Sequence, residues 1–232
     1  MDRKTWLGER RRVAEERFDT VYAPTYDRDD APMTPTHRRF VARSLESCPP
    51  GGQILDAACG TGKYFSMILD AGCRVVGVDQ SSGMLGVARA KHADVPTEKI
   101  GLQELGFVAA FDAVICVDAM ENVFPEDWPL VLGNLRRALR PGGYLYLTVE
   151  TIDERELAEV FDEATAQGVP VVQGEHFRRG GGYHYYPPIA QVNTWLSQAG
   201  LRVLEEDRSD GVGYGYHHFL TQSQAESDLP HG

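Results

Sequence analysis

Residues 54–62 read ILDAACGTG and connect an apolar run to a turn that contains two glycines. The apolar run over residues 53–57 predicts a short buried strand, and residues 63–71 beyond the turn have a helical pattern. Gly60 and Gly62 have no Cβ atom, so a ligand can lie directly against the backbone of this turn. We therefore expect a ligand site at the carboxyl end of the first strand of an open α/β sheet.

The rest of the chain continues this alternation of strands and helices. Apolar runs predict strands over residues 74–78, 99–101, 111–117, 144–150, 201–206 and 216–221, and a strand pair within residues 168–177 and 180–188. Helical patterns cover residues 84–92, 128–139, 153–167 and 189–199. This order predicts a mostly parallel sheet with helices on both faces.

The N-terminal part of the chain is charged and helical in pattern. Residues 1–23 predict a helix whose inner side is formed by Val13, Phe18, Val21 and Tyr22. The three prolines and the acids of residues 23–35, APTYDRDDAPMTP, predict an irregular loop, and residues 36–47 predict another helix.

The charge balance of the chain limits its partners. Its 232 residues contain 23 Lys and Arg against 34 Asp and Glu, a net charge of −11. A general nucleic-acid binder or a protein that docks on anionic membranes needs a basic surface, so we expect neither partner. The N-terminus lacks the apolar core of a secretory signal, which favours a cytoplasmic location. The four cysteines have neither C-x-x-C nor zinc-site spacing, so we expect no metal.

The residues around the glycine turn narrow the choice of ligand. Phe65 stands where the dinucleotide fingerprint needs its third glycine, and Tyr64 follows Lys63 where a phosphate loop needs Ser or Thr. Asp56 would repel a pyrophosphate but suits a cationic ligand. Asp79 lies about twenty residues after the turn, where a carboxylate accepts ribose hydroxyls. A ribose with a cationic end matches S-adenosylmethionine.

Four segments, ILDAACGTG, VVGVDQSSGML, FDAVICVDAMENV and LRRALRPGGYLYLTVE, resemble the successive motifs of class I S-adenosylmethionine-dependent methyltransferases. The resemblance implies an α/β, Rossmann-like fold with a mostly parallel seven-stranded sheet, helices on both faces and an antiparallel last strand. We expect a helical N-terminal lid over residues 1–47 and the binding domain over 48–222. Residues 151–188 form an α/β insertion after the fifth strand that covers the acceptor site, and 223–232 a disordered tail.

The resemblance also implies which residues bind the cofactor S-adenosylmethionine. Asp79 would bind the ribose, and Tyr26 would be a lid tyrosine, with Tyr22 as a second candidate. Leu102 and Gln103 take the place of the acid that contacts adenine in many relatives. The complete expected set is Tyr26, Asp56, Ala57, Gly60, Gly62, Asp79, Gln80, Met84, Leu102, Gln103, Asp118 and Ala119.

One segment outside the cofactor motifs predicts where the methyl acceptor binds. The segment HFRRGGGYHYYPP places His184 and Tyr186 on one face of a predicted strand, where they suit a pocket for a flat or amphipathic molecule. A histidine can take a proton from an OH or NH group near neutral pH. We predict His184, Tyr186 and Asp118 as catalytic residues, and structural roles for His217 and His218.

These features favour in-line methyl transfer to an oxygen or nitrogen of a small molecule, such as a specialised metabolite. Three alternatives stay open. A protein or tRNA methyltransferase is disfavoured because no N-P-P-Y-like motif follows the fourth strand, where VDAMEN stands. A catalytically silent nucleoside-binding module is disfavoured by the intact turn and Asp79, and a Rossmann oxidoreductase by Asp56 and the missing glycine. The sequence is also compatible with a homodimer.

Overall fold

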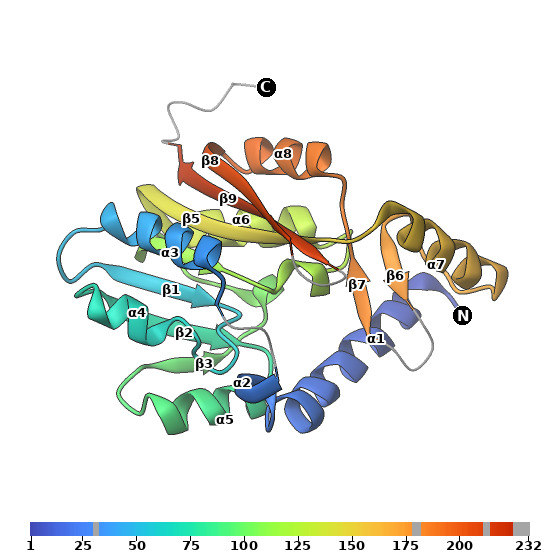
Figure 1. The fold of residues 1–232 in the computed structure, drawn as a ribbon, viewed down its shortest axis with the longest axis horizontal. Helices are drawn as coiled ribbons and strands as arrows, with labels where there is room; N and C mark the ends of the chain where they lie inside the picture. Colours follow the sequence, from blue (N-terminus) through green and yellow to red (C-terminus); the bar gives the residue numbers. More distant parts are fainter. Residues whose placement is uncertain (30–32, 178–181, 211–213, 225–232) are drawn as a thin grey trace.

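A seven-stranded sheet forms the centre of the protein in a computed structural model that describes residues 1–29, 33–177, 182–210 and 214–224 (Figure 1). The strands are β1 (Gln53–Ala57), β2 (Arg74–Asp79), β3 (Thr97–Lys99), β4 (Phe111–Cys116), β5 (Leu139–Thr151), β8 (Leu201–Asp210) and β9 (Gly215–Ser223). Their order is β3-β2-β1-β4-β5-β9-β8, in which β9 is antiparallel to both neighbours and β1 to β5 are parallel. The predicted fold class is confirmed, and the order reverses between β1 and β4.

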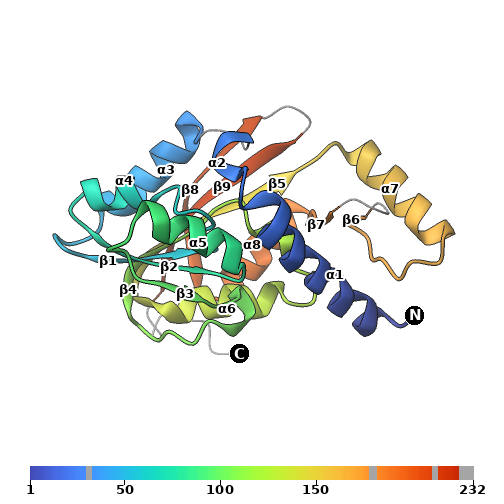
Figure 2. The same ribbon diagram turned by 90° about the horizontal axis from the view of Figure 1, so that it is seen from below.

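Helices cover both faces of the sheet because its strands are apolar on both sides. The helices are α3 (Pro35–Glu46), α4 (Phe65–Asp70), α5 (Ser82–Lys91), α6 (Trp128–Ala138) and α8 (Ile189–Gln198). Ile54 packs with Phe40 and Phe65 of α3 and α4, whereas Leu55 packs in the cluster that includes Trp128 of α6. Figure 2 shows α3 and α4 on one side of the sheet and α6 on the other. This packing confirms the predicted layers.

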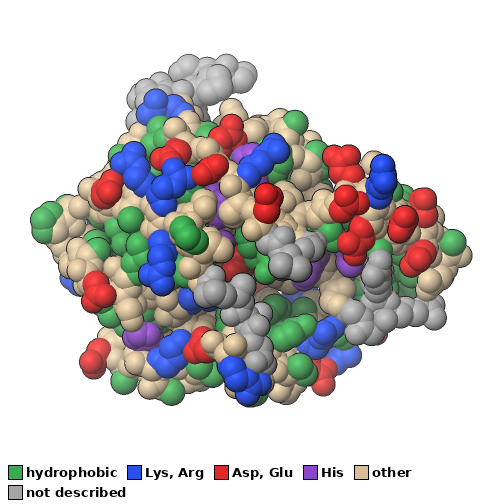
Figure 3. All heavy atoms as spheres, viewed as in Figure 1, with side chains coloured by type: hydrophobic (Ala, Val, Ile, Leu, Met, Phe, Trp, Pro, Cys, Tyr) green, Lys and Arg blue, Asp and Glu red, His purple; other side chains and the backbone are tan. Residues whose placement is uncertain are grey.

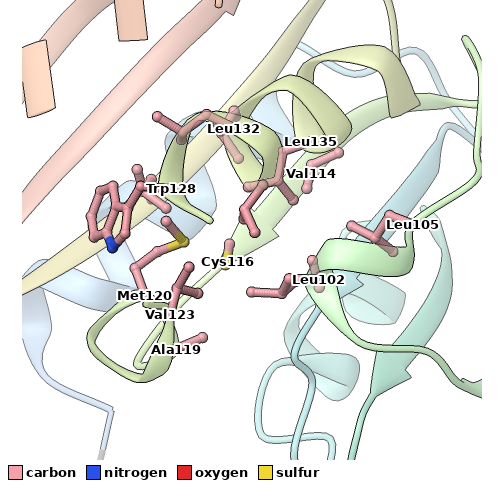
Figure 4. Packing of buried hydrophobic residues seen from close by; sticks show 14 of the residues in the cluster. Leu102, Leu105, Val114, Cys116, Ala119, Met120, Val123, Trp128, Leu132 and Leu135 are labelled. Atoms are coloured by element: carbon pink, nitrogen blue, oxygen red, sulfur yellow. The ribbon is translucent and has the colours of Figure 1, made fainter. Parts of the chain in front are cut away.

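The core beside β4 also supports the loop at its carboxyl end. Trp128 and Met120 are fully buried, and Val123 is nearly so. Figure 4 shows these three side chains together, next to Cys116 of β4. Met120 belongs to the short helix η3 (Met120–Asn122). The core thus fixes the segment that follows β4.

The insertion after β5 is a small unit of its own, made of α7 (Glu154–Ala166), β6 (Glu175–Phe177) and β7 (Tyr183–Tyr185). The antiparallel β6–β7 pair confirms the predicted strand pair, although Gly180 and Gly181 of its connection lie outside the described residues. The N-terminal helix α1 (Arg3–Arg17) packs on the insertion through Trp6 (Figure 1). The centroid of the Trp6 ring lies 5.5 Å from that of Phe177 and 5.8 Å from that of Tyr183.

The helix predicted over residues 1–23 is confirmed by α1 and its π-helical continuation, but two details of this segment were wrong: the inner side of the helix and the loop after it. Val21 is 56% exposed, and the inward residue of α1 is Trp6, because the helix packs on the aromatic insertion and not on the sheet. The chain continues past α1 as a π-helical turn, η1 (Phe18–Tyr22). The expected loop over residues 23–35 contains the short helix α2 (Tyr26–Asp29), and residues 30–32 lie outside the description.

The strand expected over residues 99–101 is β3, two residues earlier, because it pairs with Gly77 to Asp79 of β2. The expected disordered tail falls mostly on residues 225–232, which lie outside the description. In the part of the chain that the structure describes, no helix combines the length and the apolar character that a bilayer-spanning segment needs.

The N-terminal segment is attached to the domain at the start of α5. The Asp19 carboxylate accepts hydrogen bonds from the Ser81 hydroxyl at 2.5 Å and from the Gly83 amide at 2.9 Å. A negative charge at a helix N-terminus is favourable. A Cβ atom on Gly83 would lie 2.5 Å from the Asp19 carbonyl oxygen, so this close approach requires glycine.

We predict that Gly83→Ala displaces the N-terminal segment. The overlap with Asp19 should cost about 1–3 kcal/mol and lower Tm by roughly 2–8 °C. Limited trypsin digestion should then cleave faster at Arg10, Arg11 and Arg12, and thermal unfolding measures the loss. Gly86→Ala in the same helix is the control: no atom lies within 4 Å of its Cβ position, so it should leave Tm unchanged or raise it. Equal behaviour of the two variants would contradict this account of the attachment.

Candidate active site

A cleft opens at the carboxyl ends of β1, β2 and β4, next to the point where the strand order reverses. Its lining includes every residue of the predicted cofactor set except Asp56, Ala57 and Gly62. The sequence analysis did not assign several further lining residues to the site: Phe18, Ala58, Cys59, Lys63, Tyr64, Ile100, Gly101, Val117, Asn122 and Val123. Lys63 and Tyr64 directly follow the glycine turn, so their place in the sequence could have indicated them.

Asp79 is held in the cleft by backbone amides. Its Oδ2 atom accepts a hydrogen bond from Gly60 N–H at 2.9 Å, and Oδ1 accepts one from Ser81 N–H at 2.8 Å. Burial raises its pKa despite these bonds. Each oxygen retains a lone pair, and the carboxylate lines the cleft. Its position is therefore fixed, and it can accept hydrogen bonds from a pair of ligand hydroxyls.

The two glycines of the opening stretch have different surroundings. Gly60 lines the cleft, and no atom lies within 4 Å of the Cβ position built on it. A Cβ on Gly62 would instead lie 2.7 Å from the ring of Phe65. Gly60 thus leaves room for a ligand, whereas Gly62 accommodates the packing of α4. Gly62 and Ala57 are buried in this arrangement and do not line the cleft.

Asp56 lies below the turn and not on the cleft surface. It is 1% exposed, and its Oδ2 atom has no hydrogen-bond partner among the described residues. Burial, with the charge of Asp79, raises the pKa of Asp56 to about 8. The expected direct contact with a ligand is therefore not supported by its position. Asp56 is thus a buried polar group whose Oδ2 atom is left without a partner among the described residues.

The other wall of the cleft is apolar. Met84 of α5, Ile100 and Leu102 line it, and Leu102 belongs to the short helix η2 (Leu102–Glu104). The amide of Gln103 donates to Asp127 at 3.3 Å. Leu102 and Gln103 both line the cleft, as expected. A flat aromatic ring fits between such apolar side chains.

The N-terminal segment closes one side of the cleft. Tyr26 and Phe18 line it, whereas Tyr22 does not, and its hydroxyl accepts from Arg17. Asp27 fixes α2 by accepting from Thr61 at 2.5 Å and from Lys91 at 2.7 Å. The lid is thereby bonded to the glycine turn itself.

Asp118 marks the other end of the cleft. Its φ of 53° is unusual for a non-glycine residue, and its amide donates to the Thr148 hydroxyl at 2.9 Å. Burial acts to raise the pKa of Asp118, but His37 and Lys63, each 3.8 Å away, outweigh it, so the pKa is lowered. Its Oδ1 atom has no hydrogen bond to a described residue. Asp118 is therefore an ionised carboxylate that lines the cleft.

A second hollow, of about 980 Å³, lies beyond Asp118, between α7 of the insertion and the start of β9. Glu150, Tyr186 and Tyr216 line it. Burial and then the charge of Asp118 raise the pKa of Tyr216, so these two groups lie close together. The cleft and the hollow thus share a wall around Asp118.

The predicted catalytic residues divide between these two spaces. Asp118 lines the cleft, Tyr186 lines the hollow, and His184 is absent from both linings. His184 Nδ1 lies 2.9 Å from the Tyr186 hydroxyl and 3.9 Å from Glu150. Burial, with the charges of His176 and Arg17, lowers the pKa of His184 to about 4. His184 is therefore neutral at physiological pH and is a weak base. Its contact with the Tyr186 hydroxyl orients that tyrosine.

The two remaining histidines have structural contacts. His218 lies between the hydroxyls of Tyr146 at 2.9 Å and Ser209 at 2.7 Å, which supports its predicted role. His217 lies 2.9 Å from Glu206, although it also lines the hollow. Among the described residues, no three His, Cys, Asp or Glu side chains are grouped so that they could hold a metal ion.

Comparison with known proteins identifies this arrangement. Residues 54–143 match a family model described as a methyltransferase domain. Demethylmenaquinone methyltransferase of Renibacterium salmoninarum is 35% identical over 222 residues, which cover 90% of this chain and 92% of that protein. Malonyl-[acyl-carrier protein] O-methyltransferase of Serratia marcescens is 32% identical over 158 residues, 65% of this chain. In that case the chain spans about half of the relative, 54% of its length.

A solved structure shows the same fold. It is 1,6-didemethyltoxoflavin-N1-methyltransferase of Burkholderia thailandensis, with bound 1,6-didemethyltoxoflavin and S-adenosylhomocysteine. Its TM-score is 0.71 at 18% identity, over 94% of this chain and 90% of that one. The cofactor is S-adenosylmethionine. The open space above Gly60 and the fixed carboxylate of Asp79 fit its ribose, and the apolar wall at Met84 fits its adenine.

We predict that Asp79→Ala weakens S-adenosylmethionine binding about 100-fold, because two hydrogen bonds to a charged acceptor are lost. Isothermal titration calorimetry measures the affinity, and circular dichroism shows that the variant is folded. Asp70→Ala, at an exposed position on α4, is the matched control and should bind normally. Unchanged affinity of the Asp79 variant would exclude the ribose assignment.

We also predict that Asp56 makes the ligand-free protein less stable at high pH. Its pKa is higher in the folded chain than in the unfolded chain, so its contribution is complete below about pH 4 and is lost as pH rises through about 8. Asp56→Asn should match the wild-type Tm at pH 4 and exceed it by roughly 10–20 °C at pH 9. Thermal unfolding across this range tests it, with Asp70→Asn as control; parallel profiles would contradict it.

Proposed function

Because the chain belongs to the class I S-adenosylmethionine-dependent methyltransferases, we propose that it methylates a small-molecule acceptor at an oxygen or nitrogen atom. The observation that carries this proposal is the hollow beyond Asp118. A cavity of this size matches a small organic molecule, and it shares a wall with the cofactor cleft. The names of the relatives are consistent with a small-molecule acceptor, since they include a demethylmenaquinone methyltransferase and a ubiquinone biosynthesis O-methyltransferase.

In this proposal the residues of the chain act mainly by positioning. S-adenosylmethionine supplies a methyl group that is activated by a positively charged sulfur. Asp79 and Gly60 hold the ribose side, and Tyr26 of the lid excludes water from above. Asp118 provides a negative charge beside the cationic sulfur. The hollow orients the acceptor so that its nucleophilic atom approaches the methyl carbon in line, which is the largest contribution that such an enzyme makes.

Proton acceptance falls to a carboxylate in this arrangement and not to His184. Burial, followed by the charge of Asp118, raises the pKa of Glu150 to about 7, whereas the pKa of His184 is about 4. An efficient general base has a pKa near the working pH. Glu150 lines the hollow and is therefore the better placed base. Tyr186, held by His184, would contact the acceptor through its hydroxyl.

We predict that the label from methyl-deuterated S-adenosylmethionine enters the small-molecule fraction of a cell extract. The enzyme is incubated separately with metabolites below 1 kDa, bulk tRNA and protein, and the label is followed by mass spectrometry. S-adenosylhomocysteine should form in parallel, and the Asp79→Ala variant should lose both signals. Label in tRNA or protein instead would support the competing acceptor classes.

The same preparation separates an enzyme from a silent binding module and from an oxidoreductase. Calorimetry should show binding of S-adenosylmethionine and none of NADH. Binding without any labelled product in the three fractions would favour a catalytically silent module. Failure to bind S-adenosylmethionine would refute the proposed function itself.

A further inference from the structure

His37 is a buried histidine, and one of its ring nitrogens is left unsatisfied by the described residues. It lies in the first turn of α3, which Thr34 caps, and it is only 3% exposed. Its Nδ1 atom lies 2.5 Å from the Thr34 hydroxyl, whereas its Nε2 atom has no hydrogen-bond partner among the described residues. A buried polar atom without a partner destabilises the fold, which indicates that His37 has a role besides packing.

The hydrogen bonds of Thr34 indicate which nitrogen of His37 carries the proton. The Thr34 hydroxyl oxygen accepts a hydrogen bond from the His37 backbone amide at 3.2 Å, so its own hydrogen is the one that can be donated to Nδ1. In the neutral imidazole Nδ1 is then the acceptor, and we assign the N–H group to Nε2. The unsatisfied atom of His37 is therefore a hydrogen-bond donor.

This donor faces the Asp118 carboxylate of the cleft. Nε2 lies 3.8 Å from Asp118 Oδ1, and Oδ1 also has no hydrogen bond to a described residue. A buried donor and a buried acceptor thus face each other, and a shift of about 1 Å would bring them to hydrogen-bond distance. The other oxygen, Oδ2, lies 3.8 Å from Lys63 Nζ. Asp118 is therefore placed between two basic side chains.

Aromatic packing holds the His37 ring in this orientation. Its centroid lies 5.1 Å from that of Tyr216 and 4.9 Å from that of His218, and both contacts are edge-to-face. His218 is itself fixed by two hydroxyl groups. His37 lines neither the cleft nor the hollow, so it can act on a ligand only through Asp118, which does line the cleft.

Exposed acids elsewhere do not replace Asp118. Figure 3 shows acidic side chains gathered over α7, at the edge of the hollow. The exposed acids of this helix line no part of the cleft: Glu154, Glu159, Asp162 and Glu163. Salt screens exposed charges beyond about 8 Å, so these acids act weakly on a ligand in the cleft. A buried carboxylate on the cleft wall acts much more strongly.

Resting on the proposed function, in which Asp118 lies beside the cationic sulfur, we propose that His37 is a positioning residue for the methyl donor. Its Nε2–H group holds the Asp118 carboxylate so that the negative charge faces the sulfur of S-adenosylmethionine. The product S-adenosylhomocysteine has a neutral sulfur and gains nothing from this charge. His37 thus raises the affinity for the donor relative to that for the product, which favours product release after transfer.

The charge state of Asp118 depends on the same contact. Burial acts to raise the pKa of Asp118, and His37 contributes most to lowering it. Without His37, Lys63 and Tyr216 are left to oppose the effect of burial. The titratable groups around Asp118 are His37 of α3, Lys63 and Tyr64 after the glycine turn, Cys116 of β4, Glu121 of η3, Tyr146 and Glu150 of β5, and Tyr216 and His218 of β9.

His37→Leu tests the assignment by calorimetry with S-adenosylmethionine and S-adenosylhomocysteine, which differ only in the methyl group and its charge. At about pH 7 the affinity for the donor should fall about tenfold, and that for the product should change less than about twofold. The wild-type ratio of the two affinities should stay constant from about pH 8 to about pH 5. In His37→Leu it should fall as the pH is lowered, because Asp118 is then protonated more readily.

Two polar variants separate the donor group from packing. His37→Gln places an amide N–H group near the position of Nε2 and should keep the wild-type ratio within about threefold. His37→Asn has a shorter side chain that reaches only the position of Nδ1, so it should behave like His37→Leu. The comparison of these two variants decides the matter even where the apolar variant does not fold.

Phe40→Leu is the matched control, because Phe40 is fully buried on the same side of α3, one turn further along. It should lower Tm through lost packing and keep the wild-type affinity ratio. An unchanged ratio in His37→Leu and His37→Asn, equal losses in His37→Gln and His37→Asn, or the same loss in Phe40→Leu would overturn the proposal.

Asp118→Asn shows which step fails. It should lower the affinity ratio at least as far as His37→Leu does, and an unchanged ratio would overturn the proposal as well. If Asp118→Asn lowers the ratio and the His37 variants do not, only this inference fails. If the wild-type protein does not bind S-adenosylmethionine, the proposed function itself fails.

Discussion

The parallel packing of β1 between β2 and β4 is the constraint on which the site depends. It brings Asp56, Asp79 and Asp118 to one edge of the sheet, each at or just beyond a strand end. Carboxylates placed together in a buried region repel one another, and the protein resolves this differently at each position. Asp79 accepts backbone amides, Asp118 lies near two basic side chains, and Asp56 has a raised pKa. The three carboxylates can therefore lie together at this edge of the sheet without unfolding it, and their arrangement suits a cationic ligand.

The fold could be predicted from the sequence because each local signal agrees with the global arrangement. The run over residues 53–57 is β1, and the helical pattern over residues 84–92 coincides with most of α5. The cofactor side of the site could be predicted for the same reason. In a parallel sheet the topology alone places the residues that follow each strand. The location of Asp79, Asp118 and Ala119 could therefore be predicted without knowing how the side chains pack.

The errors arose where contacts between distant segments decide the structure. Trp6 faces inward because the insertion, more than 170 residues further along the chain, offers Phe177 and Tyr183 to pack against. Gly62 matches a binding motif, but its neighbour is the ring of Phe65. His184 has a suitable residue type for a base, yet burial lowers its pKa. Burial and charge environment cannot be read from residue spacing.

The cleft and the hollow are built from different parts of the chain. This difference explains why the residues of the cleft could be predicted from the sequence and most of those of the hollow could not. The cleft is built from strand ends that the parallel sheet itself brings together, whereas the hollow is lined by α7, the segment after β7, the ends of β5 and β8 and the start of β9. Asp118 and Glu121 connect them, because both follow β4 yet act on the tyrosines of the hollow. Fixing the donor in the sheet allows the insertion to vary with the acceptor.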